Sequence, residues 1–205
     1  MKLVLGKIEE MDTDAIACPS HSDLKIKPGI REAVFLAADT EKLTELCNKK
    51  GYCPIGKGVI TPSCGLPSDY IIHIVGPGWY GGRKADRELF AACFRQAMHL
   101  AFVMHCKSLA LPLMFSGKSH LPRAEALSIV TEVVYAFEEK HPEMEITLVL
   151  YNQGTYTLAE AIYESFLEDR RMRDKRFFPR LKKLWAFPVK KEKGSPGSET
   201  RNDKI

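Results

Sequence analysis

The chain has 205 residues, of which 45% are hydrophobic, and this length suits one globular domain with an appendage. It contains no run of about 18 apolar residues, which argues against a membrane-spanning helix. The net charge of +4 is uneven: residues 170–205 hold 13 Lys and Arg against 4 Asp and Glu, so the rest of the chain is mildly acidic.

The first twelve residues, MKLVLGKIEEMD, turn acidic after a short apolar stretch, which predicts a strand and not a signal peptide. Six cysteines are scattered along the chain without a CxxC pair, and closely paired ligands are what a structural zinc site needs. We therefore expect reduced thiols in a cytoplasmic, intracellular protein with no metal and no cofactor.

In the first half of the chain, short apolar runs predict strands over 3–5, 14–18, 59–61 and 70–75. Helices are predicted over 30–38 and 40–51, and in the second of these Thr40 is a candidate cap and Gly51 a stop signal.

In the second half, apolar residues at helical spacing predict helices over 86–105, 123–139 and 158–167, and apolar runs predict strands over 109–114 and 146–151. Alternating strands and helices indicate an α/β layered domain with a sheet buried on both faces. Ligands of such domains lie beyond the carboxyl ends of the strands. The loops over 18–31, 76–85 and 115–122 are therefore candidates for a site.

Four segments keep the order and spacing typical of one known family. They are TDAIACPSH (13–21), GKGVITPSCGLPSDYIIHIVGPGW (56–79), SLALPLMFSGKSHLP (108–122) and EITLVLYNQGTY (145–156). Together they resemble the macro domain family over residues 1–169, and the second segment is the most specific.

The resemblance implies a three-layer α/β/α sandwich with a mixed central sheet over residues 1–169. The charge and composition of residues 170–205 predict a basic, partly disordered tail there. It implies an ADP-ribose cleft at the strand ends, with the diphosphate held between the loops His21–Arg31 and Ser116–His120. Free backbone N–H groups and the positive end of a helix favour an anion there.

By this resemblance the ligand-binding residues are His21, Gly29, Ile30, Arg31, Ser116, Gly117, Lys118, Ser119, His120 and Tyr151. Gly29 and Gly117 let the backbone approach a phosphate closely, so we expect an anion between the two loops. Arg31, Lys118 and His120 are expected to add positive charge. Tyr151 either stacks on a ligand base or is a core tyrosine at a strand end.

The chain departs from the family pattern where the family has functional side chains. Lys7 stands in place of an aspartate that accepts a hydrogen bond from adenine, and a lysine cannot accept one. Cys18 and His21 replace two asparagines, and Arg31 or its neighbours replace an acid. Hydrolysis needs a positioned and activated water. We therefore expect weak hydrolase activity or none, and assign no catalytic residue.

Other histidines and cysteines admit further interpretations. His73 lies within a strand and is expected to be structural, with a backbone partner. Cys18, His21 and His120 fall on loops that face one another across the expected cleft, so a metal site or a Cys–His nucleophile is an alternative. Asp14 is expected to serve the local loop and strand geometry.

Three functions follow as alternatives. The first is binding of ADP-ribose, a related nucleotide diphosphate or an ADP-ribosylated protein. The second is an interaction module with a decayed cleft, and the third is an ADP-ribosyl hydrolase with unusual residues. The tail interleaves aromatic and basic residues, so it either packs onto the body or contacts nucleic acid or an acidic partner. We expect no membrane partner.

Overall fold

The computed structural model describes residues 1–78, 84–116 and 121–184. The chain divides into two units, Met1–Phe166 and Leu167–Ile205. The first unit contains the whole sheet, and the second begins within the last helix. No helix in the described ranges is both long and apolar enough to cross a membrane.

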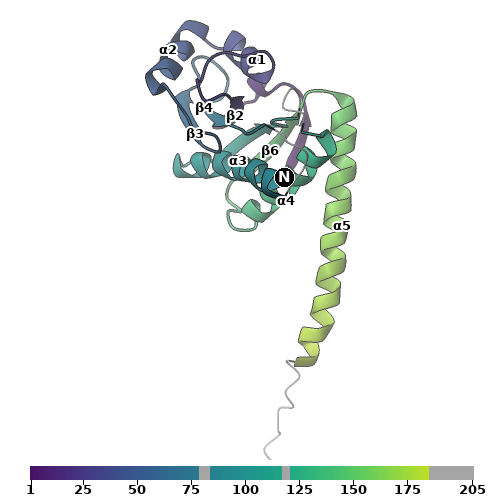
Figure 1. Ribbon diagram of the computed structural model, residues 1–205. Helices are drawn as coiled ribbons and strands as arrows, with labels where there is room; N and C mark the ends of the chain where they lie inside the picture. Colours follow the sequence, from purple (N-terminus) through teal and green to yellow (C-terminus); the bar gives the residue numbers. More distant parts are fainter. Residues whose placement is uncertain (79–83, 117–120, 185–205) are drawn as a thin grey trace, which may run out of the picture. The chain divides into compact units, whose positions relative to one another are not determined.

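The centre of the first unit is a six-stranded sheet with the order β1-β6-β5-β2-β4-β3 (Figure 1). The strands are β1 (Lys2–Leu5), β2 (Ala15–Ser20), β3 (Gly58–Pro62), β4 (Tyr70–Val75), β5 (Ser108–Pro112) and β6 (Glu145–Leu150). All neighbours run parallel except β3 and β4, which pair antiparallel across the turn at Gly65. The sheet is therefore mixed.

The described part of the chain also contains five α-helices and one short 3₁₀ helix. They are η1 (Ile8–Glu10), α1 (Ile30–Ala37), α2 (Thr40–Lys50), α3 (Lys84–Val103), α4 (Arg123–Glu138) and α5 (Gln153–Leu184). Buried residues of α3, α4 and the start of α5 share one core cluster, and those of η1, α1 and α2 share another.

The alternation of side chains along the strands assigns these clusters to opposite faces of the sheet. In β2, Ala15 and Ala17 belong to the α3–α4 cluster, whereas Ile16 and Cys18 belong to the α1–α2 cluster. All four side chains are fully buried. The predicted α/β/α sandwich with a mixed sheet is therefore confirmed, and its sheet is covered on both faces.

The carboxyl-terminal boundary has one feature that the sequence pattern did not indicate. The helix predicted at residues 158–167 is part of α5, which begins at Gln153 and continues to Leu184. The helical backbone thus crosses from the first unit into the basic segment. The last dozen residues, expected to be disordered, lie outside the described residues, and the division at residue 169 stays a prediction.

All six cysteines are buried free thiols, and none forms a disulfide. Burial raises the pKa of the Cys93 thiol to about 12. Cys93 and Cys106 belong to the α3–α4 cluster, and the other four belong to the α1–α2 cluster. These thiols act as small core residues on both sides of the sheet.

Candidate functional site

A cavity of about 460 Å³ opens at the carboxyl ends of β1, β5 and β6. Its wall comes from residues 6–9, 29, 30, 33, 112, 113, 116, 123, 149–152 and 155. We call it the strand-end pocket. Its position agrees with the general rule that α/β domains bind ligands beyond the carboxyl ends of their strands.

Four of the ligand-binding residues predicted from the sequence line the strand-end pocket. They are Gly29, Ile30, Ser116 and Tyr151. Gly117, Lys118, Ser119 and His120 lie outside the described residues. His21 and Arg31 are absent from the wall, and His21 is exposed on the loop that precedes α1.

Helix α1 presents its amino terminus to the pocket. Gly29 caps the helix with φ of 113°, a left-handed conformation that favours glycine. Among the described residues, no side chain caps the first-turn N–H groups of α1. Such groups, together with the helix dipole, make a ready site for an anion.

The opposite wall follows β5. The Ser116 hydroxyl donates to the Leu113 carbonyl oxygen at 3.1 Å, which leaves its lone pairs able to accept from a ligand. Arg123, the first residue of α4, also lines the pocket, and its side chain is exposed. Sequence reasoning placed Arg123 in a helix but missed it as a wall residue. Its position directly after Pro122, the last residue of the 108–122 segment, was the available signal.

The β1 end of the pocket combines apolar and charged groups. Ile8 is buried, and Tyr151 is 77% exposed. The Lys7 ammonium pairs with the Glu10 carboxylate at 2.9 Å, and this contact raises the Lys7 pKa. Glu9, two residues beyond Lys7, also lines the wall. A planar group at this end would therefore meet both a cation and a carboxylate.

Helix α5 begins at the same end and is capped by Asn152. The Asn152 side-chain oxygen accepts from the Thr155 backbone N–H and from its hydroxyl, each at 3.0 Å. Thr155 also contributes to the wall. The amino terminus of α5 is thus already satisfied by the protein, unlike that of α1.

The structure corrects the expected role of Arg31. Its side chain was expected to add positive charge directly to the phosphate loop, but it is only 3% exposed and points into the protein. Its guanidinium reaches the carbonyl oxygens of Leu24 and Lys25 and the imidazole of His73. All of these partners lie outside the wall of the pocket.

His73 is structural, as predicted, but its partners are side chains and not the backbone. Because the Arg31 guanidinium is only a donor, it donates to His73 Nδ1 at 2.9 Å, which places the proton of the neutral ring on Nε2. Nε2 then donates to the Thr61 hydroxyl at 2.9 Å. Burial, and then the nearby Arg31 charge, lower the His73 pKa to about 3.

The alternative of a Cys–His nucleophile or a metal site finds little support. Cys18 is fully buried, and burial raises its pKa to about 11 although Arg31 counteracts the effect. Such a thiol is protonated at neutral pH and is a poor nucleophile. The described residues hold no group of three His, Cys, Asp or Glu side chains placed to bind a metal. His120 lies outside those residues.

Asp14 lies at the amino-terminal ends of β2 and β5, whereas the strand-end pocket lies at the carboxyl ends of the strands. Its carboxylate accepts from the backbone N–H groups of Lys107 and Ser108, and its own N–H donates to the Ser108 hydroxyl at 2.9 Å. These bonds join the start of β2 to the start of β5. The expected role in loop and strand geometry is confirmed.

Comparisons with known proteins agree with this arrangement. The sequence pattern of the macro domain family matches residues 19–130. A macro domain-containing protein from Methanosarcina mazei is 35% identical over 156 residues, covering 76% of this chain and 83% of that protein.

A solved Oceanobacillus iheyensis macrodomain with ADP has a TM-score of 0.77 at 27% identity, covering 82% of this chain and 91% of that one. An O-acetyl-ADP-ribose deacetylase from Klebsiella pneumoniae is 27% identical over 169 residues, covering 80% of this chain and 97% of that protein. With a mixed six-stranded sheet, helices on both faces and a pocket at the strand ends, the chain belongs to the macro domain family.

Proposed function

We propose that the strand-end pocket binds ADP-ribose or a related nucleotide diphosphate, with weak or no hydrolysis. The observation that carries the proposal is the uncapped amino terminus of α1, which meets the pocket at Gly29 and Ile30. The same wall includes Ser116 and Arg123, which carry a hydroxyl and a guanidinium. Backbone amides, a hydroxyl and one cation suit a diphosphate, whose oxygens are acceptors.

The remainder of the pocket suits a nucleoside. Ile8, Val149 and Leu150 supply apolar wall, and the exposed ring of Tyr151 offers a face on which a base can stack. A cavity of about 460 Å³ is within the usual range for small-molecule sites. An open pocket of this size also favours ligand binding over a decayed cleft.

The residues around the start of α1 favour weak hydrolysis or none. A carboxylate there would activate a water, but Arg31 at this place is buried and bound internally. Glu9, in the short helix after β1, is the one acid among the described wall residues, and those residues include no histidine.

Isothermal titration calorimetry with ADP-ribose, ADP, AMP and ribose 5-phosphate tests the binding proposal. We expect the diphosphates to bind most tightly, and saturating ligand at 100 times its Kd to stabilise the fold by about 2.7 kcal/mol. Equal weak binding of all four compounds would contradict a diphosphate site. If removal of residues 170–205 abolishes binding, the ligand binds the tail and not the strand-end pocket.

A deacylase acting on ADP-ribose esters is the second candidate, because a relative that covers most of this chain is named O-acetyl-ADP-ribose deacetylase. Incubation of the chain with that ester, followed by chromatography of the products, separates binding from turnover. We expect slow or no release of acetate. Rapid release would show that the residues near Gly29 suffice for catalysis and would overturn the non-catalytic assignment.

Lys7 is proposed to affect which base is accepted. Its ammonium donates hydrogen bonds and accepts none, so it favours a carbonyl oxygen on a base over an amino group. Lys7→Asp should improve binding of the adenine nucleotide relative to the hypoxanthine nucleotide. The matched variant Lys7→Ala removes the charge without adding an acceptor, and should change the ratio of the two affinities less. An unchanged ratio in Lys7→Asp would place the base elsewhere.

A further inference from the structure

The loop between β2 and α1, residues 21–29, ends at the strand-end pocket but is held from inside the protein. Leu24 in this loop has φ of 53° and is 2% exposed, which is an uncommon conformation for a buried leucine. Its N–H donates to the His21 carbonyl oxygen at 2.9 Å. Such a conformation persists only where the surrounding structure fixes it.

Arg31 supplies that internal support. Its Nε donates to the Lys25 carbonyl oxygen at 2.8 Å, and one terminal nitrogen donates to the Leu24 carbonyl oxygen. The guanidinium carbon lies 4.5 Å from the centre of the Phe35 ring, which favours a cation on its face. One side chain therefore binds two consecutive carbonyls of the loop and also packs against α1.

The guanidinium is itself fixed by the sheet. His73 on β4 accepts from it, and the Thr61 hydroxyl on β3 fixes the other side of the imidazole. Cys47 of α2 lies 3.6 Å from the guanidinium through its sulfur atom. Arg31 thus connects the loop to two strands and a second helix, although none of these partners touches the pocket.

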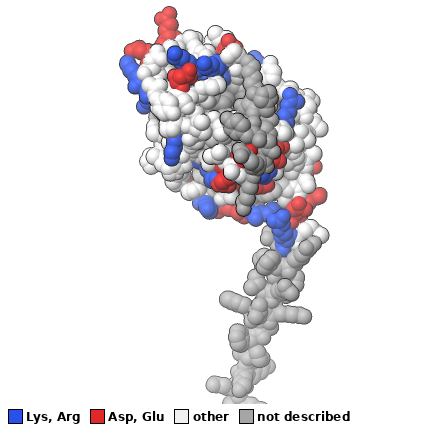
Figure 2. Space-filling view, viewed as in Figure 1, with Lys and Arg blue, Asp and Glu red and all other residues white. Residues whose placement is uncertain are grey.

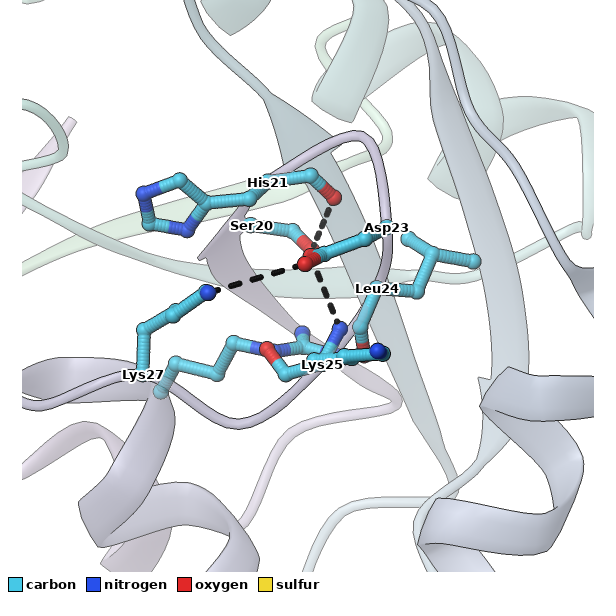
Figure 3. A network of polar contacts seen from close by, with 7 residues as sticks. Ser20, His21, Asp23, Leu24, Lys25 and Lys27 are labelled. Carbon is cyan, nitrogen blue, oxygen red and sulfur yellow. Dashed lines mark hydrogen bonds and ion pairs between the residues drawn. The ribbon is translucent and has the colours of Figure 1, made fainter.

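The outer side of the loop has weaker supports (Figure 3). Asp23 accepts from the Lys25 backbone N–H at 3.1 Å and pairs with the Lys27 ammonium at 3.6 Å. Figure 3 shows these groups gathered on the exposed turn beside Ser20 and His21. Exposed ion pairs of this kind contribute little. Inside the protein, the Cys53 backbone N–H donates to the Ser22 carbonyl oxygen at 3.0 Å, and Arg31 holds the Leu24 and Lys25 carbonyls that follow.

We propose that Arg31 is a positioning residue for ligand binding: it holds the 21–29 loop so that the first amides of α1 face the strand-end pocket. The identity of the ligand rests on the proposed function, but the control of the loop does not. Among its partners in the described part of the chain there is no carboxylate. Its role is therefore not that of an ordinary ion pair.

Two substitutions separate geometry from charge. Arg31→Met removes both the donors and the charge, whereas Arg31→Lys keeps the charge but has a single ammonium that cannot reach both carbonyls and His73 together. Val134→Ala is the matched control for general destabilisation. Val134 is fully buried in the α3–α4 cluster, on the other face of the sheet.

Hydrogen exchange followed by mass spectrometry, without ligand, measures the loop directly. Both Arg31 variants should exchange faster than the parent in peptides covering residues 21–32, and at the parent rate in peptides from α4. Val134→Ala should exchange faster than the parent in peptides from α4 and at the parent rate in peptides covering residues 21–32. If the 21–32 peptides exchange at the parent rate in both Arg31 variants, the positioning role is overturned.

Calorimetry with ADP-ribose then measures the effect on binding. A loop that holds its binding geometry about a tenth of the time should bind about tenfold more weakly. We expect roughly that loss in Arg31→Met and also a clear loss in Arg31→Lys, with parent affinity in Val134→Ala. Parent affinity in Arg31→Lys, beside a loss in Arg31→Met, would assign the effect to charge and overturn positioning.

The two proposals fail in different ways. A parent chain that does not bind ADP-ribose overturns the proposed ligand, while the exchange rates still test Arg31. If Arg31→Met does not fold, Thr61→Val takes its place, because it removes the partner of His73 and loosens the support one step away. Faster exchange over residues 21–32 is then expected, and an unchanged rate would overturn the proposal.

Discussion

A histidine, an arginine and a threonine form a chain of hydrogen bonds through the α1–α2 side of the core. His73 is fully buried and neutral between Arg31 and Thr61. Its pKa of about 3 lies well below the usual value near 6.5, because burial and the adjacent guanidinium both oppose a second positive charge. Burial raises the pKa of the neighbouring Cys47 thiol, so that group stays protonated near neutral pH.

This arrangement predicts a pH-dependent stability. Between about pH 6.5 and pH 3 the unfolded chain binds a proton at His73 that the folded chain does not. The free energy of unfolding should therefore fall as the pH falls through this window, by up to about 1.4 kcal/mol per pH unit. Urea unfolding at pH 7 and pH 5 measures the change.

The variant His73→Gln keeps a donor and an acceptor but has no proton to gain. It should lose less stability than the parent between pH 7 and pH 5. The carboxylates are common to both proteins, so their contribution cancels in the comparison. Identical losses in the two proteins would show that another group controls the acid sensitivity.

The sequence could place these residues on elements but not set the direction of each side chain. His73 within an apolar strand indicated a buried structural histidine. Arg31 is the second residue of α1, where a side chain can point to solvent or inward, and buried arginines are rare. Its partners at residues 24, 25 and 73 come together only in the folded chain. The direct phosphate role was therefore the reasonable expectation from sequence, and it was wrong.

At the scale of the elements, the amino terminus of α1 is the feature most open to test. Gly29 and Gly65 both have left-handed φ, of 113° and 99°, and an added Cβ at either would meet open space. Each change to alanine should cost about 1–3 kcal/mol of stability through backbone strain alone. Only Gly29→Ala should also weaken nucleotide binding, because only Gly29 lines the strand-end pocket.

Thermal unfolding and calorimetry of the two variants check this prediction together. The losses of stability should be similar, whereas the affinity for ADP-ribose should fall for Gly29→Ala and stay at the parent value for Gly65→Ala. An equal effect on affinity would mean that the binding loss comes from destabilisation and not from the phosphate loop.

Element boundaries show where local sequence signals suffice. Gly51 ends α2 with φ of 72°, as predicted. The cap of the same helix is Asp39, whose side chain accepts from the Lys42 N–H, while Thr40 donates to the Phe35 carbonyl oxygen instead. Two neighbouring polar residues both fit a capping pattern. Tertiary contacts with the end of α1 decide between them.

At the scale of the molecule, the core and the strand-end pocket lie in the unit Met1–Phe166. A chain ending at Asp169 should therefore fold and bind ADP-ribose with parent affinity. Circular dichroism and calorimetry measure both properties. Failure to fold would show that the basic segment is part of the domain, and the predicted boundary at residue 169 would be wrong.

The charge distribution of the body gives this truncation a second use. On the face shown in Figure 2, basic and acidic side chains lie near one another at both ends, and much of the area between them is uncharged or not described. Such a surface does not present one extended basic field. If the full chain binds nucleic acid at low salt and the truncated chain does not, the binding is therefore assigned to residues 170–205.

The buried thiols have a practical consequence for following how the molecule opens. Because each cysteine is shielded and none is disulfide-bonded, an alkylating reagent reaches a given sulfur only when its surroundings separate. Cys93 and Cys106 report on one side of the sheet, and Cys18, Cys47, Cys53 and Cys64 on the other. The order in which these sulfurs are alkylated thus records, without any introduced label, which helical layer detaches first.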